Sequence, residues 1–394
     1  MKEPRYNRLF ISAGTLFSQY MNPALFAAVI LIVLFSAVSA RAEKAFSVGF
    51  LNPTIESSSP FYMLVENILN AAANDLGIEL HITYGKNNYR RMRQAGLELL
   101  ETKKPDYFLT GYYSGATDYH MDYIKYNPAK LFMVTSSPTT DSEKEIGKPR
   151  EKYMNFIGQL TPHDREFGYK QADVLIKQAR DLGLVDKDKL VNIIAFGGFD
   201  EDNASNERLS GLQDRIEHGK DAVLIKTMLA GWNRNLSYKY TLELLRENPS
   251  IHAIWSTNDD MAIGCIDAAE EAGRKPGKDI LIGGIDLSAD AIGYIESGRQ
   301  AVSVGGQFME AAWSLIMLYD YHHGIDFGEA GNYIFHSEAH AVTKQNVADF
   351  KKYFLPADWS EIDFRRFTKK HNPDIEEYNF SLEAFQRILA NRND

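Results

Sequence analysis

Short apolar runs alternate with amphipathic stretches along most of the chain. The run 46–51 is apolar, and the stretch 60–74 has the spacing of an amphipathic helix. Ser59 suits the N-cap of this helix and Pro60 its first position, where a missing N–H is tolerated. Further predicted strands are 78–84, 107–110, 131–135, 156–158, 191–196, 222–226, 252–256, 280–283 and 301–304. Further predicted helices are 89–102, 166–180, 207–218, 238–245, 261–272, 289–297 and 308–321.

This alternation falls into two series, near 46–138 and 155–305. Alternating strands and helices predict parallel sheets with helices on both faces. We therefore expect an α/β protein with two doubly wound parallel-sheet lobes. The polar stretch 139–150 between the series predicts an exposed loop.

The N-terminal segment is different from the rest. Residues 24–38 are uncharged and apolar, basic residues precede them, and Ala40-Arg41-Ala42 follows. This pattern is typical of a secretory signal peptide, here residues 1–42, and the run is short for a membrane span. Cleavage after Ala42 is the preferred interpretation, and an uncleaved anchor is the alternative.

Charge and cysteine content exclude several classes of protein. With 43 Lys and Arg against 53 Asp and Glu, the net charge is −10, which argues against a nucleic-acid partner. Cys265 is the single cysteine, so an intrachain disulfide and a cysteine-based metal site are excluded. The acidic run 200–203 lacks the glycine and glutamate of a calcium loop, and we predict neither a metal nor a cofactor.

Polar and aromatic residues follow the predicted strands. In open parallel sheets ligands bind at the carboxyl ends of the strands, and clefts between domains are favoured sites. The candidate ligand contacts at these ends are Ser59, Phe61, Tyr62, Tyr112 with its neighbour Tyr113, Thr135, Ser136, Trp232, Asn258, Asp286 and Gln307. Aromatic faces, amides, hydroxyls and carboxylates suit a small polar, sugar-like ring. No nucleophile–base pair stands out, so we predict a protein that is not an enzyme, with a secreted enzyme as the weaker alternative.

Five segments resemble a known family. The stretch Trp255-Ser256-Thr257-Asn258-Asp259-Asp260-Met261-Ala262-Ile263-Gly264 is similar to the Asn-Asp-x-Met-Ala-x-Gly motif of type I periplasmic binding proteins of the sugar-binding group, the ribose-binding and autoinducer-2-receptor family. Ser59-Pro60-Phe61-Tyr62, the segment 206–212, Gly284-Ile285-Asp286 and Gln307 resemble further family segments in the same order. The resemblance covers residues 46–342.

The resemblance implies two lobes joined by three crossovers, near Gln159, Gln307 and Phe335, which close on a ligand by hinge bending. The implied N-terminal lobe is 43–158 plus 308–335, and the C-terminal lobe is 159–307 plus 336–345. Residues 346–394 extend past the family's usual end, and we expect them to pack on one lobe.

The resemblance also implies roles for individual residues. Asn258, Asp286 and Gln307 are the implied contacts from the second lobe and hinge. Aromatic side chains that sandwich the ring are Phe61, Tyr62 and Trp232, and Ser59 stands where many members carry a ligand-binding Asn.

Two departures concern charged residues. Thr135 and Ser136 stand where sugar-binding members often carry Asp-Arg, and Asn206 where an Arg often contacts the ring. Charged groups form stronger hydrogen bonds than neutral ones, so these losses argue against an ordinary aldopentose or aldohexose and leave a modified sugar, a cyclic polyol or another small polar molecule. Arg208 is interpreted as part of a structural ion pair.

The expected function is that of a monomeric periplasmic solute-binding protein that delivers its ligand to the membrane permease of an ABC-type transporter. The alternative output is a receptor subunit that docks on a membrane sensor kinase or chemoreceptor, for which the long C-terminal segment is the sequence hint.

Overall fold

The computed structural model describes residues 46–328, 331–354 and 358–390. The predicted signal peptide lies outside the described residues. Within them no helix is long and apolar enough to cross a membrane.

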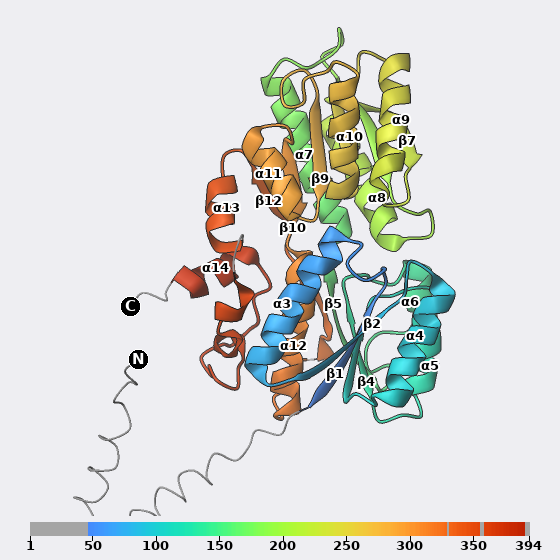
Figure 1. Cartoon of the computed structure of the whole chain (residues 1–394), viewed down its shortest axis with the longest axis vertical. Helices are drawn as coiled ribbons and strands as arrows, with labels where there is room; N and C mark the ends of the chain where they lie inside the picture. Colours follow the sequence, from blue (N-terminus) through green and yellow to red (C-terminus); the bar gives the residue numbers. More distant parts are fainter. Residues whose placement is uncertain (1–45, 329–330, 355–357, 391–394) are drawn as a thin grey trace, which may run out of the picture. The chain divides into compact units, whose positions relative to one another are not determined.

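Two six-stranded sheets organise the described chain (Figure 1). The first has the order β11-β5-β4-β3-β1-β2, and all of its pairs are parallel. Its strands are β1 (Ser47–Asn52), β2 (Glu79–Tyr84), β3 (Tyr107–Thr110), β4 (Lys130–Val134), β5 (Phe156–Pro162) and β11 (Ile334–Ser337). The second has the order β12-β10-β9-β8-β6-β7 and is parallel except for β12. Its strands are β6 (Val191–Gly197), β7 (Ala222–Leu229), β8 (Ala253–Ser256), β9 (Leu281–Ile285), β10 (Val302–Gly305) and β12 (His340–Thr343). The predicted fold class, two α/β lobes built on parallel sheets, is confirmed.

Helices cover both faces of each sheet. The helices of the first lobe are α3 (Pro60–Leu76), α4 (Tyr89–Thr102), α5 (Thr117–Ile124), α6 (Thr140–Ile146) and α12 (Glu310–His322), the last preceded by η1 (Gln307–Met309). Those of the second lobe are α7 (Asp164–Asp181), α8 (Asn203–Gly219), α9 (Arg234–Glu247), α10 (Asp259–Glu271) and α11 (Ala289–Ser297). Tyr107 and Leu109 of β3 pack in the core that includes α3 and α12, whereas Phe108 packs in the core with α4 and α5. This follows from the alternation of side chains along a strand.

One predicted loop is a helix. The polar stretch 139–150 contains α6, and the Thr139 hydroxyl accepts a hydrogen bond from the Ser142 N–H as its N-cap. The helix is short, and only Ile146 of its residues is buried. A single apolar contact gives no periodic pattern, which is why the sequence predicts a loop.

The chain passes between the sheets three times, after Pro162, after Gly305 and after Ser337. Strand β5 therefore stays in the first sheet beyond residue 158, where the predicted first lobe ends. Strand β11 likewise stays in it beyond residue 335, the predicted end of the second segment of that lobe. The lobe limits themselves remain a proposal.

Helices α7 and α8 approach each other closely at two glycines. A Cβ on Gly168 would lie 1.9 Å from the Arg208 carbonyl oxygen, and one on Gly211 would lie 2.0 Å from that of Arg165. Neither helix can accept a side chain there unless the backbones separate.

We expect Gly211→Ala to lower the free energy of unfolding by about 1–3 kcal/mol through overpacking. Urea denaturation measures this. Gly293 in helix α11 is the matched control, because a Cβ there meets nothing within 4 Å. Gly293→Ala should raise stability by about 0.5–1 kcal/mol. Equal effects of the two substitutions would contradict the close-packing argument.

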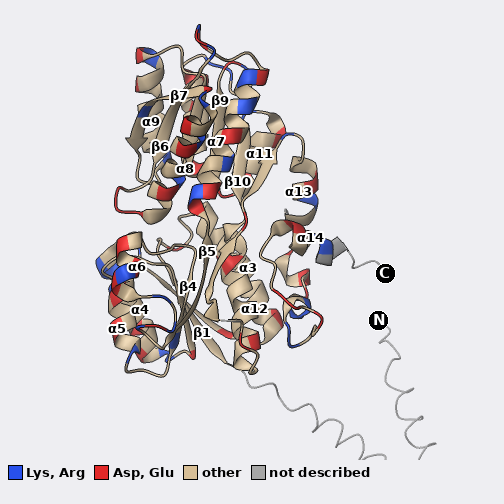
Figure 2. Ribbon diagram, turned by 180° about the vertical axis from the view of Figure 1, so that it is seen from behind, with Lys and Arg blue, Asp and Glu red and all other residues tan. Residues whose placement is uncertain are grey.

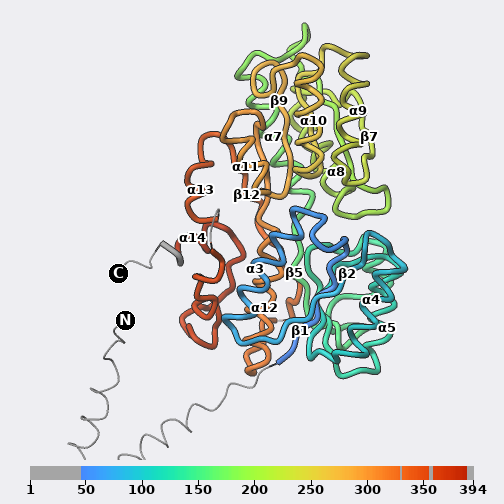
Figure 3. Tube along the Cα trace, in the orientation of Figure 1, coloured from blue at the N-terminus to red at the C-terminus, as the bar shows by residue number. Residues whose placement is uncertain are grey.

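The C-terminal extension packs on both lobes (Figure 3). It comprises α13 (Val347–Phe354), η3 (Trp359–Glu361), η4 (Phe364–Phe367) and α14 (Leu382–Ala390). The Phe364 N–H donates to Asp75 on α3, and the Tyr378 hydroxyl donates to Asp320 on α12, each at 2.7 Å. On the second lobe Lys351 pairs with Glu296 of α11 at 2.7 Å. The prediction that this segment packs on one lobe is therefore wrong: its apolar face meets helices of both.

Candidate ligand-binding site

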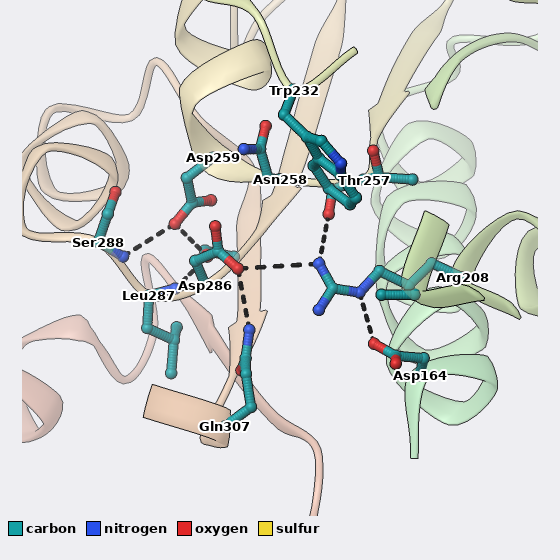
Figure 4. Close-up of polar contacts among 12 residues, drawn as sticks. Asp164, Arg208, Trp232, Thr257, Asn258, Asp259, Asp286, Leu287, Ser288 and Gln307 are labelled. Atoms are coloured by element: carbon teal, nitrogen blue, oxygen red, sulfur yellow. Dashed lines mark hydrogen bonds and ion pairs between the residues drawn. The ribbon is translucent and has the colours of Figure 1, made fainter. Parts of the chain in front are cut away.

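Arg208 on α8 lies at the centre of a polar group between the lobes (Figure 4). Its Nε donates to Asp164 Oδ1 at 2.7 Å, and its Nη1 donates to the Thr257 carbonyl at 2.8 Å. Asp286 Oδ1 lies 3.8 Å from the same Nη1. Strand β8 ends before Thr257 and β9 before Asp286, so the carboxyl ends of these strands supply the partners of the guanidinium.

Asp286 is held in a strained backbone conformation. Its φ is 130° and that of Leu287 is 57°, in the region that glycine favours. Gln307 Nε2 donates to Asp286 Oδ1 at 2.9 Å, which fixes the carboxylate from the crossover after β10. Thr135 and Trp232 also have positive φ, 63° and 60°. Such strain is typical of ligand-binding positions.

Trp232 follows β7 and lies beside Arg208. Its ring centroid is 5.8 Å from the guanidinium carbon, and its Nε1 donates to Asp202 Oδ2 at 2.9 Å. Asp202 also caps α8, since its Oδ1 accepts from the Ala204 N–H at 3.0 Å. The indole is thereby anchored at its polar edge, while its face adjoins Arg208.

The first lobe contributes hydroxyls and a buried carboxylate. The hydroxyls of Tyr62 and Tyr113 are 3.2 Å apart. Glu310, at the start of α12, accepts from the Thr135 N–H at 3.1 Å and from the Ser337 hydroxyl at 2.5 Å. This single carboxylate thus joins the ends of β4 and β11 to α12.

Burial sets the titration of these groups. It raises the pKa of Tyr62 to about 12 and holds the pKa values of Asp286 and Glu310 well above their usual range. It also raises the pKa of Asp164, where Arg208 opposes the effect, and the pKa of Asp202.

Two buried acceptor atoms of this group lack a hydrogen-bond partner within the described chain. They are Asp164 Oδ2 and Gln307 Oε1. Buried polar atoms are normally satisfied, so atoms left open at a junction between two lobes indicate a place for another molecule's polar groups.

The lobes also meet directly beside this group. Asn203 Nδ2, at the start of α8, donates to Ser137 Oγ at 3.1 Å and to the Pro138 carbonyl at 3.2 Å. These contacts connect the second lobe to the loop after β4.

The structure brings together Tyr62, Thr135, Trp232, Asp286 and Gln307 of the predicted contacts. Asn258 also lies in this group, and its Oδ1 caps α10 by accepting from the Met261 N–H at 2.9 Å. The ring of Phe61 meets that of Tyr62 edge-on, with centroids 5.1 Å apart.

Four other predicted contacts have their polar groups engaged elsewhere. The Tyr112 hydroxyl donates to Asp118, and Tyr113 takes its place beside Tyr62. Ser136 Oγ donates to the Tyr112 carbonyl, and Ser59 caps α3. Asn206 is exposed and donates to the Asp200 carbonyl. The structure does not place Asn206 in the site; Arg208, two residues on, is there instead.

Sequence reasoning missed Asp164 and Glu310. Both begin a helix directly after the chain has crossed between the sheets. Their signal was an acidic residue in the first turn of a helix, which is common at any helix N-terminus and therefore carries little information about a ligand. The ion pair predicted for Arg208 exists, and it forms the centre of the site.

Comparison with known proteins agrees with this geometry. Residues 155–324 match the family described as "Periplasmic binding protein domain". The solved structure of a periplasmic sugar-binding protein from Pseudomonas fluorescens has a TM-score of 0.75 and 28% identity, over 86% of this chain and 98% of that one. The chain is thus similar, in its fold and over residues 155–324, to the type I periplasmic binding proteins.

Two similar proteins have the names of sugar-binding proteins. The ribose import binding protein of Haemophilus influenzae is 25% identical over 279 residues, which are 70% of this chain and 85% of that protein. The D-allose-binding periplasmic protein of Escherichia coli is 33% identical over 103 residues, 26% of this chain and 32% of that protein.

Lys and Arg mix with Asp and Glu on the helices of both lobes (Figure 2). Among the described residues no group of three or more His, Cys, Asp or Glu side chains could hold a metal ion.

Proposed function

We propose that this protein captures a small polyhydroxylated, sugar-like ligand between its lobes and presents the closed form to a membrane transporter of the ABC type. The observation that carries the proposal is the Arg208–Asp286–Gln307 network, which borders the open acceptor atoms of Asp164 and Gln307. Relatives with sugars bound or sugars in their names support the same class of ligand.

Each side chain has a role that follows from its chemistry. Trp232 and Tyr62 offer aromatic faces to the apolar faces of a ring. Asp286, Asn258 and Gln307 orient hydroxyl groups, since carboxylates and amides accept the hydrogen bonds that hydroxyls donate. The network already formed around Arg208 pre-organises these partners.

The proposal is tested with sugars and polyols. Thermal-shift measurements across a panel of aldoses, furanoses, amino sugars and inositols should identify a ligand that raises the melting temperature, because a ligand that binds only the native state stabilises it. A panel in which no compound shifts the midpoint would contradict the proposal.

Asp286→Asn should then weaken binding about 10- to 100-fold, which corresponds to about 1–3 kcal/mol for a buried hydrogen-bonded group. Asn has nearly the same shape and tolerates positive φ. Calorimetric titration measures the change. Asn206→Ala is the control, since Asn206 is exposed and lies outside the site; equal losses in both variants would remove the assignment of Asp286.

A signalling output has no observation of its own in this structure. Its sequence hint was the C-terminal extension, and the buried residues Phe350, Phe364 and Phe385 of that segment pack in a core that includes helices of both lobes.

A further inference from the structure

The site between the lobes holds more carboxyl groups than cationic groups. We define the acid-rich site as Asp164, Asp202, Asp286 and Glu310 around Arg208. The exposed fractions of Asp164, Asp286 and Glu310 are 4%, 7% and 0%. One guanidinium thus lies among four carboxyl groups.

Two of the four carboxyl groups have no cationic partner within the described chain. Arg208 forms ion pairs with Asp164 and Asp286. Glu310 and Asp202 form no ion pair within the described chain; they are held by backbone N–H groups, the Ser337 hydroxyl and the Trp232 indole N–H. These neutral donors satisfy lone pairs but supply no positive charge.

The atoms left open are acceptors. Among the described residues Asp164 Oδ2 and Gln307 Oε1 have no hydrogen-bond partner, and a carboxylate oxygen and an amide oxygen can only accept. Asp164 and Gln307 flank the Arg208–Asp286 contact, one on each side (Figure 4). A molecule that completes these bonds must bring donors.

The charge of the surrounding groups determines which hydrogen-bond donor of a ligand is favoured. Burying carboxylates without cations is unfavourable, which is why the pKa values of Asp286 and Glu310 lie well above their usual range; a cation placed beside them would favour the ionised form again. A neutral hydroxyl supplies a donor without a charge. An ammonium group supplies three donors and a positive charge, and the adjacent Trp232 ring also favours a cation. A phosphate or carboxylate on the ligand would meet like charge.

We infer that the ligand is a cationic polyol, an amino sugar or amino cyclitol whose ammonium group lies against Asp164 and Gln307. The inference rests on the proposed function and narrows its ligand class.

Pairs of matched probes test the cationic-ligand inference separately from the proposed sugar-binding function. Calorimetric titrations would compare D-glucosamine with D-glucose and N-acetyl-D-glucosamine, D-galactosamine with D-galactose, and an amino-inositol with myo-inositol. We expect an amine to bind at least 10-fold more tightly than its neutral counterparts. A neutral sugar that binds as tightly as its amine would overturn the cation inference and leave the proposed function standing. Absence of binding by every probe would overturn both.

Two isosteric variants locate the charge. Asp164→Asn and Glu310→Gln each remove one titratable carboxyl group while keeping its shape, and each should lower the affinity for the amine at least 10-fold more than the affinity for its neutral counterpart. Asp214→Asn is the control, because Asp214 belongs to an ion pair with Arg165 outside the site and should leave both affinities unchanged. If both site variants lost equal affinity for the amine and for the neutral probe, the carboxyl groups would not distinguish a charged ligand from a neutral one, and the inference would be overturned.

Discussion

Replacing Arg208 with methionine should lower the free energy of unfolding by about 3–5 kcal/mol at neutral pH. The substitution keeps most of the side-chain volume but removes the only cation that pairs with Asp164 and Asp286 within the described chain. Both carboxyl groups would remain buried, and the Thr257 carbonyl would lose its donor. Removing one partner of a buried ion pair leaves an uncompensated charge, which is why the expected effect is large.

The effect should depend on pH in a definite direction. Burial raises the pKa values of Asp164 and Asp286, and Arg208 opposes the rise, so without it both pKa values should increase further. In the unfolded chain the pKa of each of these groups is about 4. Above that pH the folded variant holds more protons than its unfolded form, so its stability decreases as the pH rises toward the raised pKa values. The loss should be small near pH 4 and largest near pH 8.

Urea denaturation of the native protein and the variant from pH 4 to 8 measures the loss of stability and its dependence on pH. Arg299→Met is the control, since Arg299 pairs with Glu270 at the surface and exposed pairs contribute about 1 kcal/mol or less. A loss for Arg208→Met that stays constant with pH, or that matches the control, would show that the carboxylates do not depend on this guanidinium.

The sequence predicted the regular part of the fold because its signals are local. Helices 89–102 and 289–297 have their predicted bounds, since polar residues cap them and apolar residues repeat at helical spacing. Helix α5 was not predicted: it has eight residues and no side-chain N-cap bond. Strands β11 and β12 were not predicted either, because most of their residues are only partly buried and they lack the continuous apolar run of a buried strand such as β3.

The sequence predicted where the site lies in the fold better than it predicted which residues form it. Parallel strands place their carboxyl ends together, so residues after the strands were the right ones to inspect. Which of two neighbours faces the ligand depends on local backbone geometry. Tyr112 and Tyr113 differ by one position, and only Tyr113 reaches Tyr62. Asn206 and Arg208 lie two positions apart on α8, and only Arg208 points inward.

The extension could not be placed from the sequence, because its contacts are between residues far apart in the chain. Its aromatic residues do not follow one helical period over the whole segment. Phe364 packs against α3, almost 300 positions earlier, and the core that contains it also includes Ile292 and Ile295 of α11. The apolar face of α11 and that of α3 thus meet the same segment, which predicts that the extension is part of the folded core.

Phe385→Ala tests that prediction and should lower the free energy of unfolding by about 3–5 kcal/mol, the usual loss for a buried phenylalanine. Phe385 is 1% exposed, and its ring stacks on Phe367 with centroids 4.9 Å apart. It also packs against Phe354 and Trp359, whose rings meet Phe308 beside the crossover after β10. The cavity left by alanine would therefore loosen the contacts that the extension makes beside this crossover.

The measurement is urea unfolding followed by far-ultraviolet circular dichroism, with Tyr126→Ala as the control. Tyr126 is 87% exposed, so its loss should change stability by about 0.5 kcal/mol or less. If the extension were a peripheral appendage, Phe385→Ala would leave the main transition unchanged and add at most a small early one. A shift of the main transition to lower urea is expected instead, because the same apolar core contains Phe385, Trp313 of the first lobe and Ile295 of the second.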